Sequence, residues 1–321
     1  MKRLLSILSV CWVFASANAQ QVDFFISDGV DNEEIQALME LQVKNLLNAF
    51  NTAATTGDEL KLNGINIAPL AAQNLTMTWD VVHFAPEAMG MTGVGVPQKN
   101  SNGLVYSYQV RDIGVDMKPL NADYDGPTRR ILAIDMMPSG KILDVNFAMD
   151  PDDYAALAGK DEEGADWQRR QHIIHWCEQF LNAYNKCDMG FMENVFSEDA
   201  LVITAKNKTR HVPSDVALAD PDAAAKATAD KARYIAGLRK LFRNNKYLNV
   251  RITDYDIEPV PGKPDLYGVT LKQDWTTAKY SAKSNVYMIW DFSNEDKPKI
   301  QARIWQPVNE PPLTPAAFTL P

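Results

Sequence analysis

The sequence has few cysteines and histidines, and neither is spaced for a metal site or an obvious disulfide. It holds 3 cysteines and 4 histidines among 321 residues. Cys11 lies in the N-terminal apolar segment, which leaves Cys177 and Cys187. On one continuous helix these two would lie about 15 Å apart, whereas a disulfide needs Cα atoms within about 7 Å. A bridge therefore requires the helix to end near Asn185, and we expect two free, partly buried thiols.

The chain also lacks an excess of positive charge. Its 32 lysines and arginines are outnumbered by 41 aspartates and glutamates, so the net charge is −9 and the pI about 5.0. The long-range field of such a protein repels bare phosphate backbones. We therefore expect no nucleic-acid partner.

The N-terminal apolar run is too short to span a membrane. Lys2 and Arg3 precede it, and it closes with the small residues of Ala17-Asn18-Ala19. This is the pattern of a secretory signal peptide, and a spanning helix needs about 20 apolar residues. We expect a signal peptide at 1–19, a periplasmic or secreted location, and no membrane span.

The start of the mature protein is a testable consequence. Leu8-Ser9-Val10-Cys11 resembles a lipobox, but Val10 is too large for its position and the apolar segment before it is very short. We predict that mature protein begins at about Gln20 and carries no lipid. N-terminal sequencing of exported protein checks this, and a modified Cys11 at the first position would contradict it.

The N-terminal half, which we place at 20–150, is predicted to hold one helix followed by about four antiparallel strands. Asp31 or Asn32 can cap the helix. We expect strands at Asn74–Phe84 and in "LVYSYQVRDIGVDMK", the second bulged at Gly114, with the Gly-rich "MGMTGVGVPQKNSNG" between them as a long mobile loop. The clearest hairpin is "RRILAIDMMPSGKILDVNFAM", whose alternating strands flank good turn residues.

The second half, placed at 166–307, follows an acidic segment at 151–165 that is either a linker or the start of the next helix. Helical periodicity and strand alternation predict its elements in this order: a helix at about 167–185, a short helix, a strand at Leu201–Thr204, an exposed segment at 206–230, a helix at about 231–244, and strands at about 247–257, 266–275, 284–292 and 299–306. Pro307 should end the ordered core and leave 308–321 as a Pro-rich tail.

This element order, together with the segment "FLNAYNKCDMGFMENVFSEDALVI", resembles the nuclear transport factor 2-like superfamily, which includes SnoaL-like polyketide cyclases and ketosteroid isomerase. The resemblance covers roughly Asp166–Pro307. It implies an α+β fold in which helices pack on a curved antiparallel sheet and form a cone. It indicates fold rather than function, because this fold hosts several enzyme classes and many plain binding modules.

The whole chain also resembles a group of secreted proteins of Gram-negative anaerobic bacteria. The matching segments are Tyr267–Trp275 and Arg303–Pro307, which are "YGVTLKQDW" and "RIWQP" here. No activity follows from this resemblance. The fold class expected for the chain is α+β, with a helix-plus-antiparallel-sheet domain before the cone.

Strand alternation sorts the candidate pocket residues by face. In the two central strands, Gln273, Trp275, Met288 and Trp290 share the more apolar face, which the helices should cover. The candidate pocket residues are Trp176, Tyr184, Tyr234, Gln273, Trp275, Met288 and Trp290. A cone of this kind usually has a cavity at its open end.

The carboxylates that an enzyme of this fold would need are predicted to lie outside the cone. An isomerase of this fold uses a carboxylate base and a tyrosine or protonated aspartate donor inside the cone. Alternation puts Asp274 and Asp291 on the outer, solvated face, which counts against catalysis. His172, His175 and Glu178 follow one another in steps of three, which is not the His-Glu-x-x-His spacing. We interpret them as a polar stripe, and expect no metal and no cofactor.

Three hypotheses for function remain open. The first is a non-enzymatic binding or interaction protein for a small apolar molecule, a glycan fragment or a partner protein. The second is a SnoaL or isomerase-type enzyme that acts on a small apolar substrate in the cone. The third is a module that forms a homodimer through the exposed face of the C-terminal sheet. A buried carboxylate or histidine with a tyrosine partner inside the cone would favour the enzyme.

Overall fold

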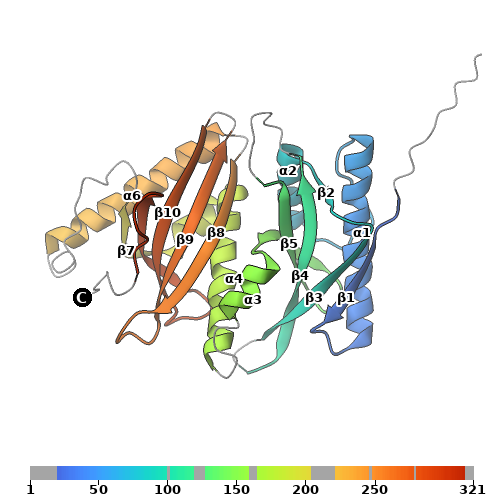
Figure 1. Ribbon diagram of the computed structural model, residues 1–321, viewed down its shortest axis with the longest axis horizontal. Coiled ribbons are helices and arrows are strands. Elements are labelled where there is room, and N and C mark those ends of the chain that lie inside the picture. The colour runs from blue at the N-terminus through green and yellow to red at the C-terminus, as the bar shows by residue number, and fades with distance from the viewer. Residues whose placement is uncertain are drawn as a thin grey trace, which may run out of the picture.

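The computed structural model describes residues 20–99, 102–118, 127–158, 165–203, 221–245, 248–277 and 280–314. The predicted signal peptide and the first part of the predicted exposed segment, up to residue 220, lie outside them. Within the described ranges, no helix combines the length and apolar character that a membrane crossing requires. The chain forms two α+β halves that lie side by side (Figure 1).

The N-terminal half packs two helices against a mixed sheet. Its elements are β1 (Asp23–Asp28), α1 (Glu33–Thr56), α2 (Pro69–Val82), β2 (Phe84–Pro86), β3 (Gly90–Lys99), β4 (Val105–Met117), β5 (Arg129–Met136) and β6 (Ile142–Ala148). The strand order is β1-β3-β4-β5-β6, and β2 pairs with β4. The antiparallel sheet predicted for this half is thus only partly correct, because β1 pairs with β3 in parallel.

Two local predictions for this half are confirmed. Asn32 caps α1, since its side-chain oxygen accepts the N–H groups of Glu34 and Ile35 at 2.9 and 3.0 Å. The β5–β6 hairpin forms as expected. Its turn places Gly140 at φ 78°, a left-handed conformation that glycine adopts without steric cost, and the Gly140 N–H donates to the carbonyl of Met137 at 2.9 Å.

The strand predicted at Asn74–Phe84 is wrong, because most of this segment is helix α2. Leu75, Trp79 and Val82 are all buried, and their spacing of four and three positions is helical. Pro69 opens the helix, a position where its missing N–H costs nothing.

The loop predicted in the Gly-rich segment is wrong for Gly90–Lys99, which form β3. Its glycines allow close packing. A Cβ on Gly93 would lie 2.6 Å from the Arg111 carbonyl oxygen, and one on Gly95 would lie 2.5 Å from a methyl carbon of Val30. The bulge in β4 falls at Arg111 and Asp112 rather than at Gly114, with Asp112 at φ 68°.

The C-terminal half contains the predicted helices and final strands, but its last helix begins at Pro221, within the segment predicted to be exposed and non-helical. Its elements are α3 (Pro151–Ala158), α4 (Ala165–Asn185), α5 (Met189–Val195), β7 (Phe196–Ile203), α6 (Pro221–Asn244), β8 (Leu248–Pro259), β9 (Leu266–Thr277), β10 (Tyr280–Asp291) and β11 (Lys299–Pro307). The sheet order is β7-β11-β10-β9-β8, with β7 parallel to β11. Helix α3 occupies the first part of the segment described above as a linker or helix start.

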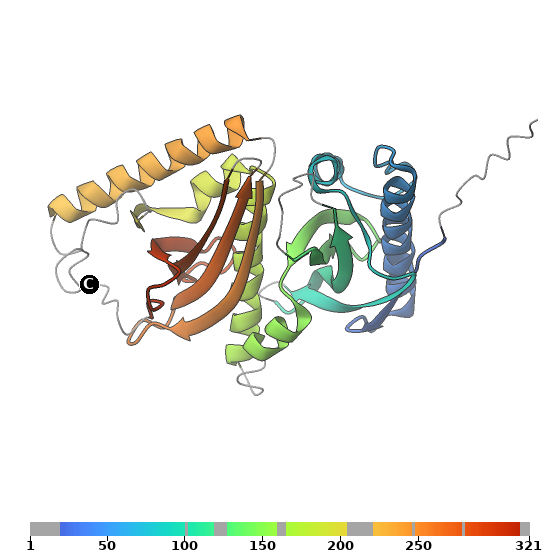
Figure 2. The same ribbon diagram turned by 45° about the horizontal axis from the view of Figure 1, so that its top comes forward.

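Helices α4 and α6 cover one face of this curved sheet, which we call the inner face (Figure 2). One apolar cluster joins them to it: Phe180 and Leu238 from the two helices pack with Leu271 and Met288 from the sheet. This is the arrangement of helices on a curved sheet that the superfamily resemblance implied. A separate apolar cluster fills the N-terminal half.

The outer face of the C-terminal sheet is less open than predicted. Tyr287, which alternation places on the same outer face as Asp291, is fully buried and belongs to a small apolar cluster that Leu313 contacts. The Leu313 N–H donates to Gln306 Oε1 at 3.0 Å, and its carbonyl accepts the Thr270 hydroxyl at 2.8 Å. The ordered core therefore continues past Pro307. A homodimer through this face remains a prediction, confined to the surface that residues 308–314 leave exposed.

Candidate functional site

Four of the candidate pocket residues meet on the inner face around a residue that the sequence did not single out, Arg303 of β11. Its Nη2 donates to Gln273 Oε1 at 3.0 Å, and its guanidinium carbon lies 5.2 Å from the ring centroid of Tyr234. The Tyr234 hydroxyl is hydrogen-bonded to that of Tyr184, whose ring packs edge-on against Trp275 at 4.9 Å. We call these five side chains the Arg303 cluster.

The cluster runs from the core to the surface. Arg303 is 4% exposed, Gln273 is 1% exposed and Tyr184 is fully buried. Tyr234 and Trp275 are only partly buried and pack against the same core. The two aromatic rings therefore connect a buried cation to a partly exposed rim.

The charge of Arg303 is not balanced by the tyrosines beside it. Burial raises the pKa of Tyr184 well above its ordinary value, although the nearby Arg303 opposes the shift. Tyr184 is therefore a neutral hydroxyl at physiological pH. Among the described residues, no carboxylate pairs with Arg303, and its buried Nε has no hydrogen-bond partner. This is an unusual position for an arginine, because buried charges are normally paired.

The three remaining candidate pocket residues have different surroundings. Met288 lies opposite Arg303 in the β10–β11 register and is fully buried, so it belongs to the wall beside the cluster. Trp290 is fully buried against Phe180, with ring centroids 6.3 Å apart, and is a core residue. Trp176 stacks on Phe191 of α5 at 6.1 Å, and none of its observed ring contacts joins it to the Arg303 cluster.

Asp274 and Asp291 alternate with the residues of the inner face. An Asp274 oxygen lies 3.6 Å from Lys283 Nζ; the Lys283 side chain is exposed and that of Asp274 is partly exposed. Asp291 accepts hydrogen bonds from the Ser293 N–H and from Gln301, each at 2.9 Å. Burial alone would raise the pKa of Asp291, but these hydrogen bonds outweigh it and lower the pKa. A carboxylate that is held ionised outside the cone is poorly suited to act as its general base.

The polar stripe on α4 joins the two halves of the molecule. Glu178 forms a two-pronged ion pair with Arg111 of β4, at 2.8 and 2.7 Å, and each side chain is 2% exposed. Glu178 also accepts the Met149 N–H at 2.7 Å. His172 contacts the carbonyl of Glu295 at 2.8 Å, so the three residues of the stripe do not converge on a metal position. Within the described residues no other group is placed to hold a metal ion.

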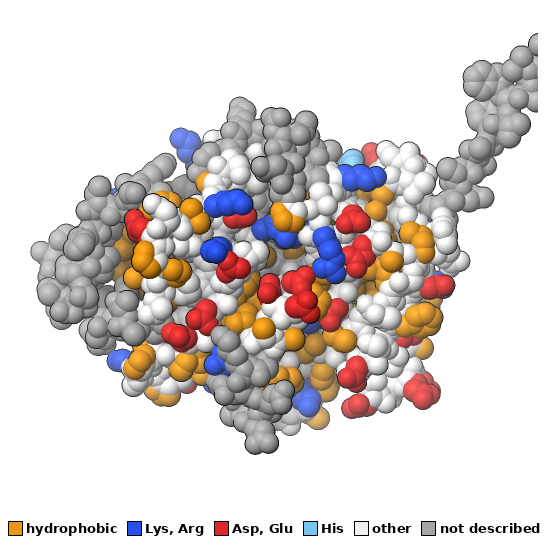
Figure 3. Space-filling model, viewed as in Figure 1, with side chains coloured by type: hydrophobic (Ala, Val, Ile, Leu, Met, Phe, Trp, Pro, Cys, Tyr) orange, Lys and Arg blue, Asp and Glu red, His pale blue; other side chains and the backbone are white. Residues whose placement is uncertain are grey.

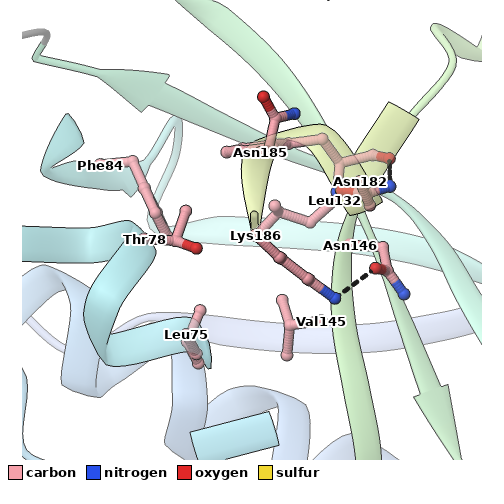
Figure 4. A pocket seen from close by; sticks show the side chains of 10 residues that line it. Leu75, Thr78, Phe84, Leu132, Val145, Asn146, Asn182, Asn185 and Lys186 are labelled. Atoms are coloured by element: carbon pink, nitrogen blue, oxygen red, sulfur yellow. Dashed lines mark hydrogen bonds between the residues drawn. The ribbon is translucent and has the colours of Figure 1, made fainter. Parts of the chain in front are cut away.

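Polar side chains also cross the boundary between the halves at Lys186. Lys186 donates to the side-chain oxygen of Asn146 at 2.6 Å (Figure 4). It also donates to both carboxylate oxygens of Asp144, at 2.8 and 2.7 Å. The cavity beside Lys186 measures about 10 Å³, which is barely the volume of one water molecule. At the surface, acidic and basic side chains mingle along the same boundary (Figure 3), where Arg129 pairs with Glu87 at 2.7 Å and with Asp150 at 3.0 Å.

Two further hollows are polar and open. One of about 140 Å³ lies between α2 and α5 and is lined by Asn74, Asp144 and Lys186 among others. The other, about 670 Å³, runs along α1 and is lined by polar side chains such as Asn45, with no aromatic residue. Neither contains an unpaired buried charge comparable to Arg303.

No protein-family model matches this chain, and no curated protein matches it. Solved structures match at low identity. The Bdellovibrio bacteriovorus protein Bd1075 is 14% identical over 52% of this chain and 48% of its own, with a TM-score of 0.33. A nuclear transport factor 2-like protein from Cytophaga hutchinsonii is 16% identical over 43% of this chain and 98% of its own, with a TM-score of 0.30. The Kfla4162 protein from Kribbella flavida is 9% identical over 48% of this chain and 98% of its own, with a TM-score of 0.34.

This chain thus spans about half the length of Bd1075. At these identities and TM-scores, likeness supports no statement about activity. The C-terminal half has the element order of a nuclear transport factor 2-like cone, and two helices cover its inner face.

Proposed function

We propose that this protein is an exported binding protein that holds a small ligand on the inner face of its C-terminal cone. The observation that carries the proposal is the buried charge of Arg303, which no described carboxylate balances. A buried charge without a counter-charge is costly, and a bound ligand would add polar contacts to those that Gln273 and the tyrosines already supply. The N-terminal signal-peptide pattern supports the exported location.

The surroundings favour a partly apolar small molecule over a glycan fragment or a partner protein. The polar groups of the cluster are buried, so a flat protein surface could not reach them. The rim beside them is aromatic and consists of the partly buried rings of Tyr234 and Trp275. Small-molecule sites typically combine such apolar walls with a few polar groups that fix orientation.

An isomerase-type reaction has less support. The hydroxyl pair of Tyr184 and Tyr234 offers donors of the kind that stabilise an oxyanion. Among the described residues, however, no carboxylate or histidine joins that pair, since Asp274 and Asp291 alternate with the inner-face residues. The arrangement supports ligand binding without a general base.

The experiment uses Trp275 as the reporter. Titration with octanol, a neutral apolar probe, should change the intrinsic tryptophan fluorescence of the full-length mature protein in a saturable way. Trp275→Phe should remove most of that change, because the indole lies in the Arg303 cluster. Trp167→Phe is the matched control and should keep it, because Trp167 is 40% exposed at the start of α4.

Asp274→Asn tests the enzyme alternative in the same assay and should leave the titration unchanged. An equal signal in the Trp275→Phe and parent proteins would place the binding site elsewhere. The absence of any saturable change would contradict a ligand site in the cone.

A further inference from the structure

We infer that the ligand of the cone is a monocarboxylic acid with an apolar body, and that Arg303 binds its carboxylate. This inference rests on the proposed binding function and names the chemical class of the ligand. It follows from the charge, the donor geometry and the surroundings of the Arg303 cluster.

A second buried arginine, Arg111, is paired with a carboxylate of the same chain and provides a comparison for Arg303. Arg111 and Arg303 are 2% and 4% exposed. Arg111 binds both oxygens of Glu178, at 2.8 and 2.7 Å. Around Arg303 the described residues offer the neutral Gln273 oxygen and a tyrosine hydroxyl instead of a carboxylate. The Nε atoms of both arginines lack a hydrogen-bond partner, so the difference between them is the counter-charge. Thus no described residue near Arg303 supplies a carboxylate as Glu178 does for Arg111.

The charges around Arg303 favour a ligand that carries a single negative charge. Arg303 contributes one positive charge, and its described polar neighbours are the uncharged amide of Gln273 and the hydroxyls of Tyr184 and Tyr234. A phosphate ester carries more than one negative charge near neutral pH and is usually met by several cations or by a helix N-terminus. One guanidinium matches one carboxylate, which it can bind with two parallel hydrogen bonds.

The tyrosine pair adds a donor for the same group. The two hydroxyls carry two protons, and the hydrogen bond between them uses one. A second proton therefore remains available to a carboxylate oxygen beside the guanidinium. A ligand carboxylate would accept from Arg303 and from one tyrosine.

The rest of the ligand would be apolar. Trp275 and Tyr234 form the partly exposed rim of the cluster, and Phe196 packs against Tyr234 with ring centroids 5.6 Å apart. Val202, which pairs with Arg303 across β7 and β11, is fully buried. A second charged group on the ligand would find no opposite charge among these side chains.

The test compares probes that share one tail and differ in the head group: octanoate, octanamide, octanol and octyl phosphate. Dissociation constants are measured at neutral pH by calorimetry on the full-length mature protein. Octanoate should bind at least tenfold more tightly than octanamide and more tightly than octyl phosphate. Arg303→Met should remove the preference for the acid and leave octanamide and octanol binding within about twofold, because a lost charge-assisted hydrogen bond affects only the anion.

Two variants keep the test decisive if Arg303→Met fails to fold. Arg303→Lys retains the charge but not the two-pronged donor, so it should lower octanoate affinity several-fold and leave octanamide unchanged. Tyr234→Phe removes the partly exposed hydroxyl of the pair and leaves only the fully buried Tyr184 hydroxyl, so it should also weaken octanoate selectively. Arg239→Met is the control, since Arg239 is exposed on α6 and pairs with Glu193, and it should change no affinity.

The failures are distinguishable. Equal affinity for octanoate and octanamide, or tighter binding of octyl phosphate, would overturn the carboxylate inference and leave a binding site in the cone. No binding of any probe, octanol included, would overturn both the inference and the proposed function.

Discussion

Replacing Trp290 with alanine should lower the free energy of unfolding by about 3–5 kcal/mol, the usual cost of truncating a buried tryptophan. Trp290 is fully buried on the inner face, where its ring packs against Phe180 at 6.3 Å and Phe292 at 6.0 Å. Because an ordinary domain is stable by only about 5–15 kcal/mol, the loss should appear as a large fall in the urea midpoint followed by circular dichroism, or as insoluble protein.

Two further variants separate the stability that comes from burying Trp290 from any contribution of its indole N–H. Trp167→Ala removes a tryptophan that is 40% exposed and should change stability by about 0.5 kcal/mol at most. Trp290→Phe keeps much of the buried area and removes an indole N–H that has no hydrogen-bond partner, so it should cost clearly less than Trp290→Ala. Equal losses in Trp290→Ala and Trp167→Ala would mean that Trp290 is not a core residue.

The second large effect is expected at the ion pair between the two halves. Arg111→Met should lower the free energy of unfolding by about 3–5 kcal/mol, because it leaves the buried Glu178 carboxylate without its counter-charge. Glu178→Leu should lower the free energy of unfolding by a comparable amount, since it leaves the buried Arg111 guanidinium without a counter-charge. The double variant should cost much less than the sum, because no buried charge then remains unpaired. Urea denaturation of all four proteins gives this coupling energy.

The exposed pair of Arg239 and Glu193 provides the control. Its side chains are 59% and 40% exposed, so Arg239→Met should cost at most about 1 kcal/mol. If the two single variants at Arg111 and Glu178 were additive, the ion pair would not be what couples α4 to β4.

The sequence identified elements whose local pattern is strong. The Asn32 cap and the turn at Gly140 are set by a few neighbouring residues, so the start of α1 and the β5–β6 hairpin were predicted correctly. Alternation along 267–275 also placed Gln273 and Trp275 on the inner face, beside the helices. These predictions succeeded because the side-chain period of a helix or strand is fixed by its backbone geometry.

Local pattern failed where distant contacts decided the structure. The residues before Phe84 alternate roughly like a strand, yet Leu75 and Trp79 pack as one face of α2. The segment with Gly93 and Gly95 has loop composition, yet the lack of side chains is what lets the neighbouring chain approach β3. Neither outcome can be deduced from a window of ten residues, because the packing partner lies elsewhere in the sequence.

By itself, the sequence determined the signal-peptide pattern, the acidic charge and the helix and strand order of the second half, all of which depend on composition or on neighbouring residues. Only the tertiary structure decided that Arg303 stands among Tyr184, Tyr234 and Gln273 without a described carboxylate, whereas Arg111 meets Glu178. Both arginines lie in strands and look alike in sequence. Their different partners come from helices and strands far away along the chain, and burial turns that difference into the strongest indication of a binding site.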